Sequence, residues 1–468
     1  MVTNANHSPA ELLNLSALEQ ARLIKQRLIS SESLTRLYLS RIESFNSDLN
    51  AFVHLNGKRA LRKARQHDNA VKQSKGNDLP LFHGVPTGIK DLVPVAGTPS
   101  RLGSRAYRYF IAPFDGPVVK HLDAGGFVSL GKLATSEFGV LPTTEPDIHP
   151  PTRNPWDRTC TSGGSSGGSG TAVAAGLVPI AQGSDGGGSV RIPAALCHLY
   201  GFKPSLSLLG NLHGKYNRLG ISVMGPLARY VSDAAAMLDV MAGRPRATED
   251  EASCLNACSV PVTPLKICLV IDSAIGAAKP DIIAGIRQVA KTLEALGHEV
   301  VEKEPATGDL EEFLPVWQYA VGGVPAITER VLRPVTRWLR ADAKHVSFEQ
   351  ADTARRQLAK LVHDVIGDAD VCLSPTVGVG APKLGQFDAP DDPRAWFYES
   401  AYLGGYTAPF NLTHGPAASL PVGLTAGGLP YGAQIAGKPG DDHLILRLSK
   451  QLEEALPWHG RWAPGYQP

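Results

Sequence analysis

Two clusters of glycine and serine flank a short apolar segment, and they constrain the fold of this chain more than any other feature. The clusters cover residues 162–170 and 183–189, and the apolar segment between them covers 171–180. A run of alanine, valine and leucine of this length predicts a buried helix or strand. A flexible linker shares the Gly/Ser composition, but it would not enclose a buried segment. We therefore expect both clusters to be held in the core.

The second cluster also predicts a type of chemistry. Ser189 directly follows three glycines, which allow unusual φ angles and a close approach of the backbone to a ligand. Successive N–H groups in such a turn can converge on one anionic oxygen. A serine hydroxyl beside such a turn indicates acyl transfer, although this stretch supplies no base.

Three motifs together resemble a known family. They read Gly-Ile-Lys-Asp at 88–91, Gly-Gly-Ser-Ser-Gly-Gly-Ser at 163–169 and Asp-Gly-Gly-Gly-Ser-Val-Arg-Ile-Pro-Ala at 185–194. In this order they resemble the amidase signature family, which also places its two serines as Ser165 and Ser189 stand here, 24 positions apart. Further similar stretches, at 115–119, 131–132, 225–229, 409–413 and 428–434, extend the resemblance over nearly the whole chain.

The resemblance implies an α/β fold, an α/β/α sandwich around a large twisted mixed sheet. It also implies an amidase in which Ser189 is the nucleophile, Ser165 relays protons and Lys90 is the base. A cis peptide bond before Ser165 is a further family feature. The oxyanion would be bound by backbone N–H groups of Gly186, Gly187, Gly188 and Ser189.

Physical chemistry sets a condition on Lys90. A lysine with its free pKa of ~10.4 is almost wholly protonated at neutral pH and cannot act as a base. Burial lowers that pKa, and Ile89 and Val93 give Lys90 an apolar neighbourhood in sequence. No clear alternative base exists, because His198, the histidine nearest to Ser189 in sequence, falls in a helix expected after Ala194.

Two departures from the family pattern bear on function. Gly186 stands where many members carry Thr or Ile, and Ile192 stands where the glutamine-dependent tRNA amidotransferase subunit typically has Gln. They favour an enzyme that hydrolyses a small-molecule amide alone, with esters, anilides and hydrazides as further candidates. An amidotransferase-type subunit that passes ammonia to another acceptor stays open.

A Ser-His-Asp hydrolase also stays open, because residues 163–167 match the Gly-x-Ser-x-Gly nucleophile elbow. An elbow needs a strand directly before it, whereas residues 154–158 have the composition of a loop. A third rival, a phosphate loop at 126–132, is rejected because its interior is apolar and Leu133 follows its lysine.

Aromatic residues are the only indication of the substrate. If some of them line the pocket, the acyl group is apolar or aromatic, but ordinary core packing explains each of them equally well. They are Trp317, Trp338, Trp396, Phe397, Tyr398, Tyr402 and Tyr406.

Composition excludes several other classes. The chain of 468 residues has 46 Lys+Arg against 44 Asp+Glu, so no broad basic face for nucleic acid is expected. Cys254 and Cys258 have no second Cys/His pair nearby, and we expect neither a metal site nor a cofactor. The N-terminal 15 residues lack a signal-peptide core, and no run approaches the ~18 apolar residues that span a membrane. These observations predict a cytoplasmic enzyme without membrane contact, and a homodimer is left open.

Short apolar strands alternate with helices along the chain, as in an α/β fold. Helices are expected at 16–46, with a break at 30–32, and at 57–76, 118–124, 232–241 and 280–296. Strands are expected at 51–55, 127–130, 265–271 and 371–374. Without a clean linker, residues 1–468 are interpreted as a single domain with a mainly helical elaboration at about 309–366.

Overall fold

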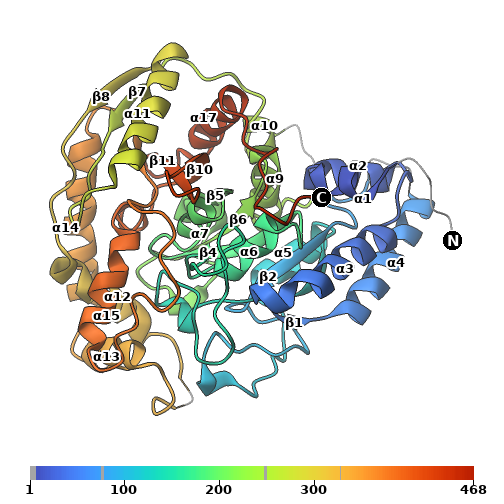
Figure 1. Ribbon diagram of the computed structural model, residues 1–468, viewed down its shortest axis with the longest axis horizontal. Coiled ribbons are helices and arrows are strands. Elements are labelled where there is room, and N and C mark those ends of the chain that lie inside the picture. The colour runs from blue at the N-terminus through green and yellow to red at the C-terminus, as the bar shows by residue number, and fades with distance from the viewer. Residues whose placement is uncertain (1–6, 75–77, 247–249, 327) are drawn as a thin grey trace.

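A mixed sheet of eleven strands forms the centre of the molecule (Figure 1). The computed structural model describes residues 7–74, 78–246, 250–326 and 328–468. The strand order is β1-β3-β2-β4-β6-β5-β10-β11-β9-β7-β8. The strands are β1 (Phe52–Leu55), β2 (Pro86–Lys90), β3 (Val128–Leu133), β4 (Ile180–Asp185), β5 (Tyr200–Lys203), β6 (Val223–Ala228), β7 (Lys266–Leu269), β8 (Glu299–Glu302), β9 (Val371–Pro375), β10 (Ala417–Leu424) and β11 (Pro430–Ala436).

Helices lie on both faces of this sheet. Successive residues of a strand point to opposite faces. On β5 the Tyr200 hydroxyl bonds Ser449 of α17 (Asp442–Ala455), whereas Gly201 packs against Ala194 of α7 (Arg191–Leu196). The two helices therefore lie on opposite faces, which confirms the expected layered α/β fold.

The helices follow the expected order along the chain. The helices up to residue 257 are α1 (Pro9–Asn14), α2 (Ala17–Lys25), α3 (Ser31–Leu49), α4 (Gly57–Gln73), α5 (Pro117–Ala124), α6 (Gly167–Ala174), α7 (Arg191–Leu196), α8 (Leu206–Leu209), α9 (Val231–Met241) and α10 (Cys254–Ala257). The later ones are α11 (Pro280–Ala295), α12 (Leu310–Gly322), α13 (Pro334–Ala343), α14 (Phe348–Ile366), α15 (Pro393–Ala401), α16 (Pro409–Leu412) and α17 (Asp442–Ala455). In Figure 1 the blue helices α1–α4 lie at one end of the sheet, and α12–α15 lie on the opposite side of the molecule.

Local sequence explains where several helices begin. Ser30 caps α3 by accepting a hydrogen bond from the Ser33 N–H, which confirms the expected break before this helix. Ser347 and Gln350 form a reciprocal capping box at the start of α14. Residues 309–366, expected to form a helical elaboration, contain α12, α13 and α14. The assignment of the whole chain to one domain remains a prediction.

One sequence prediction was wrong. A helix was expected after Ala194, but α7 already contains this residue and ends at Leu196. His198 therefore lies outside the helix, in a left-handed conformation with φ of 58°. The chain turns there because β5 must begin at Tyr200 to pair with β6.

The two Gly/Ser clusters are buried, as expected. Residues 162–170 are buried throughout, and in 183–189 only Gly186 and Gly187 are partly exposed. The apolar segment between the clusters completes α6, turns and enters β4, of which all six residues are buried. Both interpretations of this segment, helix and strand, thus hold for different parts of it.

Candidate active site

Strand pairing brings the three motifs together at one edge of the sheet. β2 and β4 are parallel neighbours, so their carboxyl ends lie at the same edge, where α/β proteins usually bind ligands. Lys90 is the last residue of β2, and β4 ends at Asp185. The turn that carries Ser189 follows β4, and Ser165 lies just before α6, which packs on both strands.

Lys90 is fully buried, and its side-chain nitrogen contacts only neutral groups. Its Nζ lies 2.8 Å from Ser165 Oγ, 3.1 Å from Ser184 Oγ and 3.3 Å from the Ser184 carbonyl oxygen. Burial lowers the pKa of Lys90 to about 7, and the nearby Asp185 opposes this effect only in part. A substantial fraction of the amine is therefore neutral at pH 7, as the sequence analysis required.

Lys132, on the neighbouring strand β3, is equally buried but has a different role. Its Nζ forms an ion pair with Asp91 at 2.6 Å and donates to the Val93 carbonyl at 2.7 Å. The carboxylate compensates the buried charge. The rejected phosphate loop at 126–132 is thus largely a buried strand with a paired lysine.

Ser165 is held between Lys90 and a glycine. The Gly164–Ser165 peptide bond is cis, as the family resemblance implied. A Cβ atom at Gly139 would lie 3.2 Å from Ser165 Oγ, so the chain at Gly139 packs directly on this hydroxyl. Ser166 and Ser169 have structural roles, since their hydroxyls donate to the carbonyls of Ser184 and Gln182.

A buried ion pair anchors the turn that carries Ser189. Arg191 donates from Nε and Nη2 to the Asp185 carboxylate at 2.9 and 2.8 Å. Burial alone would raise the pKa of Asp185, but Arg191, with Lys203 and Asn411, outweighs burial and holds this pKa well below its usual range. Asn411 and Gln434 complete the network by bonding Arg191 at 2.6 and 2.7 Å.

The backbone donors near Ser189 are not equivalent. The Gly188 N–H donates to Asp185 Oδ1 at 2.8 Å, so this donor is already used. Within the described residues, the N–H groups of Gly186, Gly187 and Ser189 donate to no protein atom. The oxyanion donors expected from the sequence are therefore reduced from four to three.

Ser189 opens onto a largely apolar cavity of about 180 Å³. The Ser189 side chain lines it together with Gly187, and no hydrogen bond joins Ser189 Oγ to Ser165 Oγ among the described contacts. Of the aromatic residues singled out in the sequence, Trp317, Phe397 and Tyr406 line this cavity. The others pack elsewhere: Trp338, Trp396 and Tyr398 belong to a neighbouring hydrophobic cluster, and Tyr402 donates to the Ala277 carbonyl.

No group of three or more potential metal ligands exists among the described residues. All six cysteines are free thiols. In the described part of the chain, no helix has the length and hydropathy needed to cross a bilayer.

Sequence reasoning missed three contributors to the site. Ser184 contacts Lys90, Gly139 packs on Ser165, and Asn411 bonds Arg191. A polar residue at the carboxyl end of a buried strand was a usable signal for Ser184. Gly139 and Asn411 gave none, because only the fold brings them to the motifs.

Comparisons with known proteins agree with this arrangement. A family model described as Amidase matches residues 33–446. An acylamidase from Rhodococcus erythropolis is 32% identical over 466 residues, which cover 95% of this chain and 96% of that protein. A glutamyl-tRNA(Gln) amidotransferase subunit from Nitrosococcus oceani is 31% identical over 501 residues, covering 96% of this chain and 99% of that protein. The solved structure of 6-aminohexanoate cyclic dimer hydrolase complexed with substrate has a TM-score of 0.86 and 29% identity, and covers 97% of this chain and all of that one.

The fold and the similar proteins define an α/β enzyme that acts on carbon–nitrogen amide bonds. The chain belongs to the amidase signature family, as its motifs indicated.

Proposed function

We propose that this amidase hydrolyses a small-molecule carboxylic amide through a serine acyl-enzyme. Ser189 is the nucleophile, Ser165 relays protons and Lys90 is the base. The observation that carries the proposal is the buried, uncompensated Lys90 amine, whose Nζ lies 2.8 Å from Ser165 Oγ and whose pKa is lowered to about 7. General bases work best when their pKa lies near the working pH.

The proposed reaction has two stages. Neutral Lys90 takes the Ser165 hydroxyl proton, Ser165 takes the Ser189 proton, and Ser189 Oγ bonds to the carbonyl carbon. The free N–H groups of Gly186, Gly187 and Ser189 stabilise the resulting oxyanion. When the carbon–nitrogen bond breaks, the proton returns through Ser165 to the leaving amine. Water then attacks the ester on Ser189, and the same relay releases the acid.

A fluorophosphonate reagent tests the nucleophile. Intact mass should show one added phosphonyl group, and peptide mapping should place it on Ser189. The Ser189→Ala variant should take up no label and should lose up to ~10⁶ in kcat on an anilide substrate. A label on Ser165, or near-normal turnover by Ser189→Ala, would refute the assignment.

An amidotransferase-type subunit is the second candidate, because one similar protein carries that name. An amino-acid amide such as glutamine carries a carboxylate, which would need a cationic side chain to bind it in the cavity. Among the described residues that line the cavity, none is Lys, Arg or His. Ile192, which stands in place of the Gln of that subunit, is part of the apolar lining. We expect hydrolysis of simple amides by the purified chain alone. Activity that requires partner subunits and charged tRNA would favour the second candidate.

A histidine-based hydrolase has little support. Within the described residues the nearest strand upstream of Ser165 ends at Leu133, so the elbow has no strand before it. His198 stacks edge-on against Trp156 and does not line the cavity. His213 Nε2 lies 3.2 Å from Ser222 Oγ, and no carboxylate bonds its ring among the described contacts. A homodimer and a cytoplasmic location remain predictions, and light scattering would test the first.

A further inference from the structure

Residues of two separate hydrophobic clusters line the cavity beside Ser189. We call the first the near compartment, formed by Gly139, Val140, Leu141 and Phe397. We call the second the far compartment, formed by Val270, Val362, Ile366, Cys372 and Phe410. The side chains of the far compartment are all at most 8% exposed and belong to one hydrophobic cluster. Helix α14 contributes Val362 and Ile366, so the helical elaboration supplies part of this lining.

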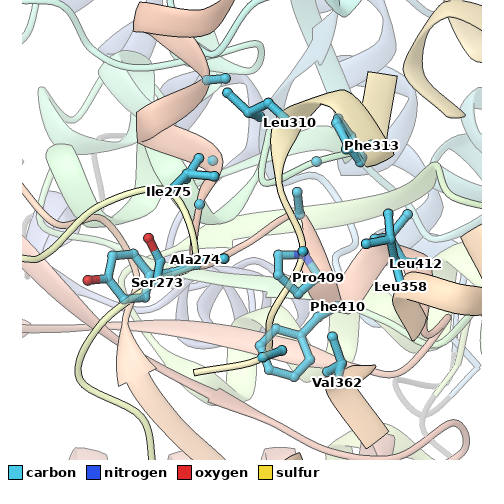
Figure 2. Close-up of a pocket in the computed structure, with 18 of the residues that line it drawn as sticks. Ser273, Ala274, Ile275, Leu310, Phe313, Leu358, Val362, Pro409, Phe410 and Leu412 are labelled. Atoms are coloured by element: carbon cyan, nitrogen blue, oxygen red, sulfur yellow. The ribbon is translucent and has the colours of Figure 1, made fainter. Parts of the chain in front are cut away.

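Figure 2 shows how the side chains surround the cavity. Phe410 and Val362 lie on one side, and Leu358 and Leu412 lie beside them. Leu310, Phe313 and Ile275 face them from other segments. These residues come from positions far apart in the chain, which explains why no sequence window revealed the cavity.

The proton path distinguishes the two compartments. The leaving amine must receive its proton from Ser165, and Ser165 Oγ packs against Gly139 of the near compartment. The amine half of the substrate therefore belongs at the near compartment. Because the carbonyl carbon is bonded to both halves, the acyl half must extend from Ser189 toward the far compartment.

The lining also restricts the charge of the acyl group. The only charged side chains among the described lining residues are Asp272 and Asp309, and both are exposed to solvent. An acyl group with a carboxylate would thus lose its hydration without gaining a cationic partner, which is costly. A neutral hydrocarbon group would gain free energy from burial.

We propose that the far compartment is an acyl-chain pocket that selects neutral hydrocarbon acyl groups, and that Val362 limits their length. The whole cavity, with a volume of about 180 Å³, exceeds the ~150 Å³ that holds benzene in another protein, so its two compartments together accommodate about six carbons or slightly more. This inference rests on the proposed function, because it assumes that Ser189 attacks the carbonyl group.

The test measures kcat/KM on a series of p-nitroanilides from acetyl to decanoyl. The wild type should gain roughly fourfold per added methylene, as burial of each one predicts, until the pocket is full. A terminal carboxylate on the octanoyl chain should abolish this gain. N-alkyl acetamides, which lengthen the amine half instead, should show no comparable dependence.

Variants at Val362 assign the length limit to the far compartment. The readout is the ratio of octanoyl to acetyl kcat/KM within each variant. Val362→Phe should lower this ratio by about tenfold or more, since the ring displaces at least two methylenes. Val362→Ala should raise the decanoyl to octanoyl ratio. Gln357→Phe places the same ring at an exposed position of α14 and should keep the wild-type profile.

The outcomes separate this inference from the proposed function. If wild type neither hydrolyses acetyl anilide nor labels at Ser189, the proposed function fails. If acetyl anilide is hydrolysed but the acyl series is flat, or only the amine series depends on length, the acyl-chain pocket is refuted. Fluorophosphonate labelling of each variant reports an intact site. If Val362→Phe does not label, the opposite shift expected for Val362→Ala still decides the question.

Discussion

At the residue scale, two buried lysines on adjacent strands show that contacts determine chemical role. Lys132 neutralises its charge with Asp91, whereas the Lys90 amine contacts only hydroxyl and carbonyl oxygens. Desolvation therefore acts almost unopposed on Lys90 and lowers its pKa to about 7. The same residue type is a structural cation at one position and a candidate base at the other.

Lys90 should set the acid limb of the rate profile. Because only the neutral amine accepts a proton, kcat/KM should fall about tenfold per pH unit below pH 7. Lys90→Arg should be inactive at every pH, since a guanidinium does not deprotonate in this range. Activity assays from pH 5 to 9 on both proteins check this. Full activity of Lys90→Arg would exclude lysine as the base.

The same shift predicts how stability depends on pH. The folded-state pKa of Lys90 is about 7, below its ordinary value of 10.5, so the unfolded chain binds more protons between these two pH values. The contribution of Lys90 to the free energy of unfolding must therefore rise as the pH increases from about 7 to 10.5. Denaturant titrations of wild type and Lys90→Met across this window should show a smaller rise in the variant.

Gly186 and Gly188, both in the turn before Ser189, should differ in their tolerance of a side chain. At Gly188, φ is 125° and a Cβ would lie 2.1 Å from Thr407 Oγ1, so Gly188→Ala should abolish labelling of Ser189 or unfold the protein. At Gly186 the nearest atoms to a Cβ lie at 3.6 Å, an ordinary contact distance. Gly186→Ala should therefore keep its melting temperature within a few degrees of wild type. Equal effects of the two substitutions would contradict this account.

At the element scale, the turn between β4 and α7 is held by charges rather than by a regular backbone pattern. Asp185 closes the turn by accepting from the N–H groups of Gly188 and Val190 as well as from Arg191. Asn411 and Gln434 bring α16 and β11 to the same guanidinium. This network couples the position of Ser189 to the last third of the chain.

Loss of Arg191 should be costly because it leaves a buried carboxylate without its partner. Arg191→Ala is expected to lower the unfolding free energy by about 3–5 kcal/mol, as measured for broken buried pairs. Arg158→Ala, which removes an exposed pair with Asp48, is the matched control and should change little. Denaturant unfolding monitored by fluorescence compares them. Similar small effects of both would show that the network does not anchor the turn.

At the scale of the whole molecule, burial of neutral histidines makes the fold sensitive to acid. Burial lowers the pKa of His67 and His198 to about 3 and that of His213 to about 4. The unfolded chain therefore binds more protons than the folded protein between these values and pH ~6.5. The three histidines therefore contribute most to the free energy of unfolding above pH ~6.5, and this contribution is lost as the pH falls from ~6.5 toward their folded-state pKa values. Asp233, whose pKa burial raises to about 7, acts in the opposite direction.

His67 allows this acid sensitivity to be measured. It is buried, and its Nδ1 lies 3.3 Å from Nδ1 of His83. Replacing it with glutamine should reduce the slope of unfolding free energy against pH by up to about 1.4 kcal/mol per pH unit between pH 4 and 6. The exposed His345→Gln serves as the control. Parallel slopes for wild type and His67→Gln would contradict the expectation.

Local sequence determined the elements and the motif residues. Alternation and capping predicted β1, α3, α5, α9 and α11 to within a few residues, because these patterns depend on neighbours in the chain. The three motifs indicated Lys90, Ser165 and Ser189 together, and the fold brings their segments to one sheet edge. The prediction that a helix contains His198 was wrong, because the pairing of β5 with β6 outweighs the local sequence pattern there.

Only the tertiary structure decided the properties that depend on desolvation and on distant neighbours. It removes water from the Lys90 amine, assigns the Gly188 N–H to Asp185, and packs Gly139 on the Ser165 hydroxyl. It also joins Val270, Phe410 and α14 into one apolar compartment beside Ser189. The physical reason is that a pKa, a satisfied donor and the shape of a cavity are set by atoms that meet in space, which no spacing along the chain specifies.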